Sequence, residues 1–276
     1  MPPAYQEIFS EWSLPIGLTA ILILCAVIYV RGWFAIGKTR PAQFPWWRPA
    51  VFLLGLAVIW FAIGSPLDGF ADALLSAHMV EHLLLMSFAP PLILLGYPVV
   101  PLLRGLPRPV RIYVFGPLIR IKALRNLGHL LITPLIAWLA MNLAFLGWHV
   151  PAAYDFALEH ERWHEVEHLC FLGTSILFWW PVIRPWPTRQ SFAGWFLLLY
   201  LVMADIVNTV LSAFLAFCDR PVYGYYLREP NAFNFSPLSD QRAGAVVMWV
   251  VGSVIFLVPA VSIAFGILQP RERQLI

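Results

Sequence analysis

Two short stretches of the chain each place two histidines four residues apart, with a glutamate between them. Residues 78–83 read HMVEHL and residues 164–169 read HEVEHL, so both fit the pattern H-x-V-E-H-L. If these stretches are helical, the two histidines of each stretch lie on one face, about 6 Å apart along the helix axis. Imidazole nitrogen suits copper, zinc and iron. The duplicated pattern therefore predicts a metal or cofactor site built from two helices.

The predicted site draws on further residues. We expect five histidines to be metal ligands: His78, His82, His149, His164 and His168. Glu81 and Glu167 are candidates for outer partners that hold an imidazole N–H, although they could instead line a proton path or pair with Arg162 or Arg242. A single histidine in a membrane helix is often only a packed residue. Two parallel pairs, each with a carboxylate, favour a binding site, because ionisable groups inside a bilayer cost several kcal/mol each.

The identity of the bound group is less determined by these residues. Cu(I) is the favoured ion if thioethers join the imidazoles, and the nearby methionines that could do so are Met79, Met86, Met203 and Met248. Most of these methionines are expected to be packing residues. Zinc is an alternative, and so is haem, which one imidazole from each of two facing helices could ligate.

A zinc protease is the remaining alternative. The stretches HERWH, from His160 to His164, and HEVEH, from His164 to His168, both match HExxH, in which the glutamate is a general base. Asp205 could then be a third ligand. The first copy of the histidine pattern has Met79 where such a base would stand, so we expect a protein that is not an enzyme.

Composition places this site in a membrane. Of 276 residues, 60% are apolar and only 12% are charged, and the mean hydropathy is +0.74. Soluble domains carry about 25% charged residues, so this chain is expected to be an integral membrane protein. The net charge of +3 does not suggest a nucleic-acid partner. The three cysteines have no spacing typical of a disulfide framework or a thiolate cluster.

The predicted fold is all-α, with seven transmembrane helices in one membrane domain that covers residues 1–276. A spanning helix needs about 20 mostly apolar residues. The stretches that qualify are Leu14–Val30, Pro49–Gly64, Ala73–Leu95, Leu127–Trp148, Trp163–Val182, Phe192–Phe217 and Ala243–Leu268. Internal prolines at positions 90, 91, 134 and 259 predict kinks. Asp205 and Asn208 are polar residues of the sixth stretch that could bridge helices or accompany a proton or metal path.

The charges predict the orientation of these helices. Met1 to Trp12 has two glutamates and no Lys or Arg, so we expect no cleavable signal peptide there. With the N-terminus outside and the C-terminus inside, 14 of the 18 basic residues fall in inner segments, and Glu272 is the one acid there. Residues 104–126 mix basic and apolar side chains and are predicted to be an amphipathic inner loop on the anionic leaflet. The histidine patterns then lie on the outer side.

Four stretches, in order, resemble the multi-spanning CtaG family of cytochrome c oxidase assembly factors of bacterial membranes. They read SAHMVEHLLLMSFAPPLILLGYP, GWHVPAAYDFAL, HEVEHLCFLGTSILFWWPVI and LSDQRAGAVVMWVVG, and the resemblance runs from about Ser65 to Phe265. It carries over the five histidines, and it matches Asp240 and Gln241 to the family's DQ. It gives His160 no counterpart. Asp240 is also a candidate outer partner of the metal or, with Ser239, a cap of the last helix.

The resemblance implies an accessory protein of oxidase maturation in the bacterial inner membrane. It implies that copper is bound at the outer histidine cluster and helped toward the outward-facing copper centre of the oxidase. The implied partners are the lipid bilayer, the oxidase subunits, subunit II first, and an outer soluble copper chaperone. A copper importer and a metal-free scaffold for oxidase subunits remain alternatives.

Overall fold

The computed structural model describes residues 4–188, 192–228 and 235–268, and all its regular structure is helical. The all-α prediction is therefore confirmed for this part of the chain. The helices are α1 (Ala4–Glu11), α2 (Ile16–Gly37), α3 (Trp47–Gly64), α4 (Leu67–Ala73), α5 (Leu75–Leu83), η1 (Leu84–Phe88), α6 (Ala89–Leu95), α7 (Val99–Gly105), η2 (Val110–Phe115), α8 (Gly116–Arg120), α9 (Lys122–Leu131), α10 (Pro134–Trp148), α11 (Pro151–Glu159), α12 (Glu161–Ile183), α13 (Gly194–Phe217), α14 (Tyr225–Arg228) and α15 (Pro237–Leu268). Elements η1 and η2 are π-helical.

Six helical units in the described residues are long and apolar enough to cross a membrane: α2, α3, the continuous unit α5–η1–α6, α12, α13 and α15. The predicted fourth span is not one helix. It consists of α9 and α10, which meet at an angle of 68°. Thr133 precedes Pro134 and is extended, because the proline ring disfavours a helical conformation in the residue before it. Counted as one span, this bent pair gives seven, and the count of seven stays a prediction.

The third span, where Pro90 and Pro91 predict a kink, contains a π-helical turn directly before these two prolines. Pro90 and Pro91 have no N–H, so the helix cannot supply its usual donor to the carbonyl of Met86. The indole Nε1 of Trp179 donates to that carbonyl instead, at 3.2 Å. Trp179 belongs to α12, so the bond ties together the two helices that carry the duplicated histidine pattern.

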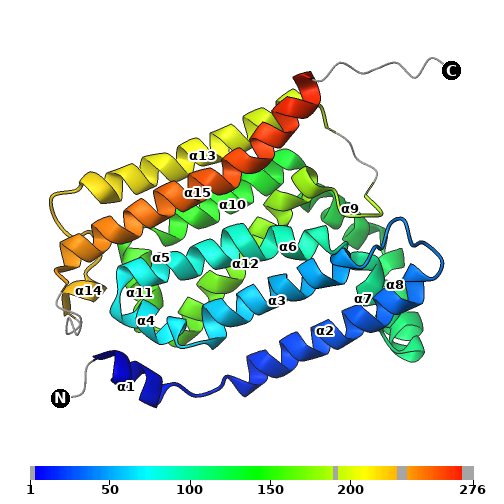
Figure 1. The fold of residues 1–276 in the computed structure, drawn as a ribbon, viewed down its shortest axis with the longest axis horizontal. Coiled ribbons are helices and arrows are strands. Elements are labelled where there is room, and N and C mark those ends of the chain that lie inside the picture. The colour runs from blue at the N-terminus through cyan, green and yellow to red at the C-terminus, as the bar shows by residue number, and fades with distance from the viewer. Residues whose placement is uncertain (1–3, 189–191, 229–234, 269–276) are drawn as a thin grey trace.

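The bundle has an inner group of helices covered on two sides (Figure 1). Helices α13 and α15 pack along each other on one side, and α2 and α3 lie on the other. Helices α5, α6, α10 and α12 lie between them and supply much of the apolar core. At the edge, α2 comes very close to α7: a Cβ added to Gly32 would lie 1.8 Å from the carbonyl oxygen of Pro101. Glycine is therefore required at this crossing.

Short helices lie at both ends of the bundle (Figure 1). Short helices α4, α11 and α14 cover one end, which we call the acidic end, and α7, η2, α8 and α9 form the other, the basic end. The predicted amphipathic segment 104–126 is at the basic end. It is largely helical rather than a loop, and it exposes apolar side chains such as Tyr113 and Ile119 beside Arg120 and Lys122. Arg189, Arg271, Glu272 and Arg273, which entered the orientation prediction, lie outside the described residues.

Candidate metal centre

The histidine cluster lies at the acidic end, where α5 and α12 both begin. His78 and His82 are fully or almost fully buried on α5, and His168 is buried on α12. His164, one turn before His168, is partly exposed. The ring centroids within each helix are 4.2 Å apart. Each pair therefore forms the single face that four-residue spacing predicts.

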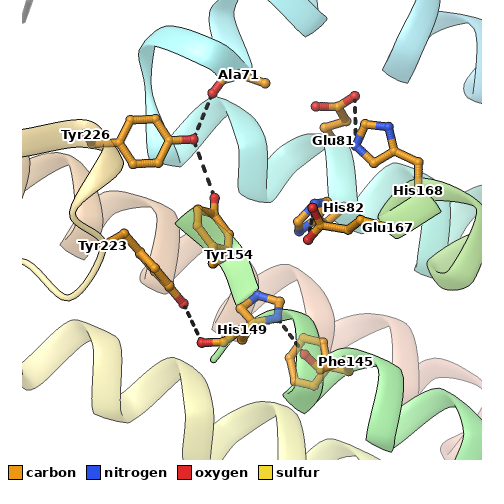
Figure 2. A network of polar contacts seen from close by, with 10 residues as sticks. All are labelled: Ala71, Glu81, His82, Phe145, His149, Tyr154, Glu167, His168, Tyr223 and Tyr226. Carbon is orange, nitrogen blue, oxygen red and sulfur yellow. Dashed lines mark hydrogen bonds and ion pairs between the residues drawn. The ribbon is translucent and has the colours of Figure 1, made fainter. Parts of the chain in front are cut away.

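The two pairs face each other. The rings of His78 and His164 are stacked with centroids 5.2 Å apart, and those of His82 and His168 are 5.9 Å apart. His149 joins from the end of α10, with its ring 5.8 Å from that of His82. The structure thus brings all five predicted histidine ligands into one cluster, which we call the histidine cluster. It is drawn in part in Figure 2.

The glutamates cross between the helices (Figure 2). Glu81 of α5 lies 3.5 Å from Nε2 of His168, and Glu167 of α12 lies 3.6 Å from Nε2 of His82. Each carboxylate thus faces the second histidine of the other helix, because the two copies of the pattern meet face to face. In the described residues, the ion-pair partners of the two glutamates are these histidines and not Arg162 or Arg242.

The ring of His149 has a fixed orientation. Its Nδ1 lies 2.7 Å from the carbonyl oxygen of Phe145, so Nδ1 carries the hydrogen and donates it. In the neutral ring, Nε2 then has no hydrogen and its lone pair is available to a metal ion. This arrangement follows from the position of His149 directly after α10, where the Phe145 carbonyl is near the end of the helix. His149 is therefore prepared to act as a ligand through Nε2.

The cluster contains many buried polar atoms without a hydrogen-bond partner, and the crossed glutamates lie 3.5–3.6 Å from only two of its ring nitrogens. Atoms without a hydrogen-bond partner include both ring nitrogens of His78 and His82, Nε2 of His149, His164 and His168, and the carboxylate oxygens of Glu81 and Glu167. Buried polar groups nearly always have partners, and unpaired ones are costly. A cation among these nitrogen and oxygen donors would satisfy them together, so the residues fit a metal ion.

Two sets of three donors are compact enough to hold an ion. His78, His82 and Glu167 form one, and His78, Glu81 and His164 form the other, with the donor atoms of each set within 4.8 Å of one another. Each triad includes one glutamate. Glu81 and Glu167 could therefore be direct ligands of an ion as well as the outer partners predicted for them. His78 belongs to both triads.

Three tyrosines pack beside the cluster (Figure 2). Tyr154 of α11 lies with its ring 5.2 Å from that of His78 and stacks on Tyr223 at 4.0 Å. The hydroxyl of Tyr226 donates to the carbonyl of Ala71 at 2.9 Å, and that of Tyr223 lies 3.4 Å from the carbonyl of His149. Burial raises the pKa of all three phenols. They therefore remain neutral and exclude water from this side of the cluster.

An acidic cavity opens on the other side of the cluster. It has a volume of about 540 Å³, and His164 and His168 line it together with Asp68, Glu161 and Glu165. Burial raises the pKa of the Asp68 carboxyl, and the nearby charge of Glu161 raises it further. We call this cavity the acidic vestibule. Its carboxylates can attract a cation toward the two histidines of α12.

The carboxylate of Asp240 is bonded to the start of α5. Its carboxylate accepts hydrogen bonds from the backbone N–H groups of Leu75, at 2.7 Å, and Ser76, at 3.2 Å, and from the Ser76 hydroxyl at 2.5 Å. It therefore caps α5, the helix that carries His78 and His82, from a different helix. Its own helix is capped instead by Ser236, whose Oγ accepts from the N–H of Ser239 at 3.1 Å, because Pro237 begins that helix.

Gln241, the next residue, holds the segment that follows α13. Its Oε1 accepts from the N–H of Val222 at 2.7 Å, and its Nε2 donates to the carbonyl of Leu215 at 3.0 Å. Asp240 and Gln241, the two residues of the predicted DQ motif, thus hold the start of α5 and the segment at Val222 in position.

Other polar residues of the sequence analysis lie elsewhere. His160 is exposed between α11 and α12, with Nδ1 2.9 Å from the carbonyl of Phe156. Asp205 accepts from Ser253 at 2.8 Å, and the amide of Asn208 donates to the carbonyl of Met248 at 3.3 Å. These two residues bridge α13 and α15, which is the first of the two roles predicted for them. Sequence reasoning missed Tyr154, whose contact with His78 depends on how α11 folds back.

Fold and cluster together define a class: a helical membrane protein with a buried, metal-fitting histidine and glutamate cluster. The chain belongs to the cytochrome c oxidase caa3 assembly factor family, Caa3_CtaG, whose family model matches residues 27–269. The resemblance predicted from the sequence is thereby confirmed.

Curated relatives are longer than this chain. Uncharacterized proteins of Mycobacterium bovis and Mycobacterium tuberculosis are each 26% identical over 284 residues, an alignment that covers 99% of this chain and 41% of theirs. One of Mycobacterium leprae is 26% identical over 264 residues, covering 90% of this chain and 38% of its own. The chain therefore spans about two fifths of the length of these relatives. No solved structure matches it.

Proposed function

We propose that this assembly factor binds copper in the histidine cluster and assists its delivery to the copper centre of a cytochrome c oxidase. The observation that carries the proposal is the set of buried nitrogen and oxygen atoms without hydrogen-bond partners, contributed by α5, α12 and the residue after α10. Imidazoles suit copper, and the crossed carboxylates supply the negative charge that a cation needs inside a membrane. Copper here is cargo, so a cluster of exchangeable imidazoles serves it better than a closed thiolate site.

Copper is favoured over haem because the five rings are close together. Their centroids are separated by as little as 4.2 Å within a helix and 5.2–5.9 Å between neighbouring helices. The donor atoms of each triad lie within 4.8 Å of one another, which suits a bare ion better than a macrocycle. Cu(I) is the oxidation state we propose, because thioether side chains line the space next to His82.

We propose seven spans, with the acidic end and its histidine cluster facing the outside of the bacterial inner membrane. The concentration of basic side chains in α7, η2, α8 and α9 supports placing the basic end in the cytoplasm. A cluster on the outer side is where copper for an outward-facing oxidase centre is needed. The partners we propose are oxidase subunit II as recipient and an outer soluble copper chaperone as donor.

The proposal is tested by copper content in two places. Purified protein is compared with a variant in which His78, His82, His164 and His168 are all alanine, for bound copper in detergent and for oxidase copper and activity in cells. We expect the variant to lose copper and the cells to lose active oxidase. Equal copper retention would overturn the site. Copper loss with a normal oxidase would overturn the delivery role.

The acidic vestibule is expected to set the rate of loading and not the final affinity. Replacing Asp68 with Asn and Glu161 and Glu165 with Gln removes three carboxylates that line it. Metal uptake followed by stopped flow at low salt should slow about tenfold or more, because charge in a cleft raises the local cation concentration. The amount bound at equilibrium should change little.

Ionic strength and pH provide the controls for this prediction. The rate difference should shrink in high salt, which screens exposed charges. The pKa of Asp68 is raised, so its share of the attraction is lost as pH falls through that raised value and is present above it. Asp219→Asn, at an exposed position outside the vestibule, should load at the normal rate. An unchanged rate in the triple variant would show that copper enters by another route.

A further inference from the structure

A second cavity, lined by methionines, lies next to the histidine cluster. It has a volume of about 30 Å³, and four methionines from three helical units line it: Met79, Met86, Met141 and Met248. All four side chains are buried. We call it the methionine cavity. Three of them, Met79, Met86 and Met248, are methionines that the sequence offers as thioether ligands, whereas Met203, the fourth such candidate, is 40% exposed.

His82 joins the methionine cavity to the histidine cluster. It lines the cavity, is 3% exposed, and neither of its ring nitrogens has a hydrogen-bond partner. The acidic vestibule shares no lining residue with the methionine cavity and is lined by His164 and His168 instead. The histidine cluster thus lies between the two cavities, with α12 histidines facing one and an α5 histidine facing the other.

The polar groups of the methionine cavity fit a cation of low charge. Asn142 and Asn208 line it, and their amide nitrogens are used on the carbonyls of Trp138 and Met248. The described lining contains no carboxylate. A divalent ion would be costly to desolvate without a counter-charge, whereas a soft monovalent ion needs less compensation and prefers thioether sulfur.

Gly252 keeps space next to one of these amides. A Cβ added there would lie 2.7 Å from Nδ2 of Asn208, and both residues line the cavity. Buried methionine is ordinarily a packing residue, and these four also belong to the apolar core. Packing alone does not account for a cavity that four methionines line together with an imidazole whose nitrogens have no hydrogen-bond partner.

We propose that the methionine cavity is a second binding site, for Cu(I), with thioether ligands and His82 as the residue it shares with the histidine cluster. This inference rests on the proposed function, because it takes copper as the ion that reaches His82. The site is weaker than the histidine cluster, since its ligands are neutral. An ion entering from the acidic vestibule meets the histidine cluster first and the methionine cavity second.

The test compares Cu(I) binding in two methionine variants under anaerobic conditions. Met79, Met141 and Met248 are replaced together with leucine, a near volume match that cores tolerate well. Met203→Leu is the matched control, since its side chain lies outside the cavity. Competition with a chromophoric Cu(I) chelator gives stoichiometry, and X-ray absorption at the copper edge reports sulfur neighbours. The full-length protein in detergent is used throughout.

We expect wild type and Met203→Leu to bind more Cu(I) than the triple variant and to show sulfur neighbours that the triple variant lacks. Zn(II) binding should be the same in all three. Copper with nitrogen and oxygen neighbours alone in wild type would overturn the methionine site and leave the proposed function standing, and this reading needs no variant to fold. Sulfur-bound copper that persists undiminished when the four cluster histidines, His82 included, are alanine would overturn the sharing of His82 between the two sites.

Discussion

Replacing His78 with alanine is expected to weaken metal binding at the histidine cluster more than any other single substitution. His78 is a member of both donor triads, one with His82 and Glu167 and the other with Glu81 and His164. Its loss removes a nitrogen from each set. Loss of an outer partner alone typically costs 10–100-fold in metal affinity, so we expect a loss of at least about 100-fold for this shared ligand. Metal content after dialysis and a competition titration measure it.

The carboxylates provide the graded comparison. Glu81→Gln and Glu167→Gln each change one triad and keep the size of the side chain, so each should weaken binding less than His78→Ala and by similar amounts. His129→Ala is the matched control, because His129 is exposed on α9 at the basic end. If His78→Ala bound metal as well as either glutamine variant, the two triads would not share a ligand.

The duplicated histidine pattern could be predicted to form a site because four-residue spacing fixes the face of a helix locally. Both pairs do lie on single faces, and His149 does reach them. The crossing of Glu81 and Glu167 could not be predicted, because it depends on how α5 and α12 are rotated toward each other. That rotation is a property of the packed bundle, to which the bond between Trp179 and the Met86 carbonyl contributes.

For the membrane spans too, features set by a local segment could be predicted, and features set by tertiary packing could not. Apolar length predicted the long helices, since hydropathy is a property of each segment. It also predicted a single span over Leu127–Trp148 with a kink at Pro134, and the structure has a bend of 68° before that proline. The proline was visible in the sequence. What was not visible is that α9 has no buried residue, so nothing in the core holds it in line with α10.

Met141 and Asp240 were missed or misread for one reason: their partners are distant in the chain. Met141 lies in an ordinary apolar stretch. It could not be predicted as a candidate ligand, because only the packing of α10 brings it to the cavity lined by His82. Asp240 bonds to Leu75 and Ser76, which precede it by 165 and 164 positions in the sequence. Its place near the start of a helix suggested a cap for that helix, whereas it caps α5.

Asp240→Ala is therefore expected to be the most destabilising of the polar substitutions outside the histidine cluster. It removes three hydrogen bonds to a buried carboxylate and leaves the N–H groups of Leu75 and Ser76 without that partner. Leaving a buried donor unpaired costs about 1–3 kcal/mol, so we expect a loss of about 2–4 kcal/mol in the free energy of unfolding. Thermal unfolding of the metal-free protein in detergent measures it.

Graded variants separate a structural role for Asp240 from a metal-binding one. Ser76→Ala removes only the hydroxyl bond, so its effect should be smaller, about 1 kcal/mol. Asp219→Ala, an exposed aspartate, should leave stability unchanged. Because the start of α5 positions His78, metal affinity should fall in Asp240→Ala and Ser76→Ala in step with stability. A variant of Asp240 that lost metal affinity while keeping full stability would instead place its carboxylate in the metal centre and contradict its role as the cap of α5.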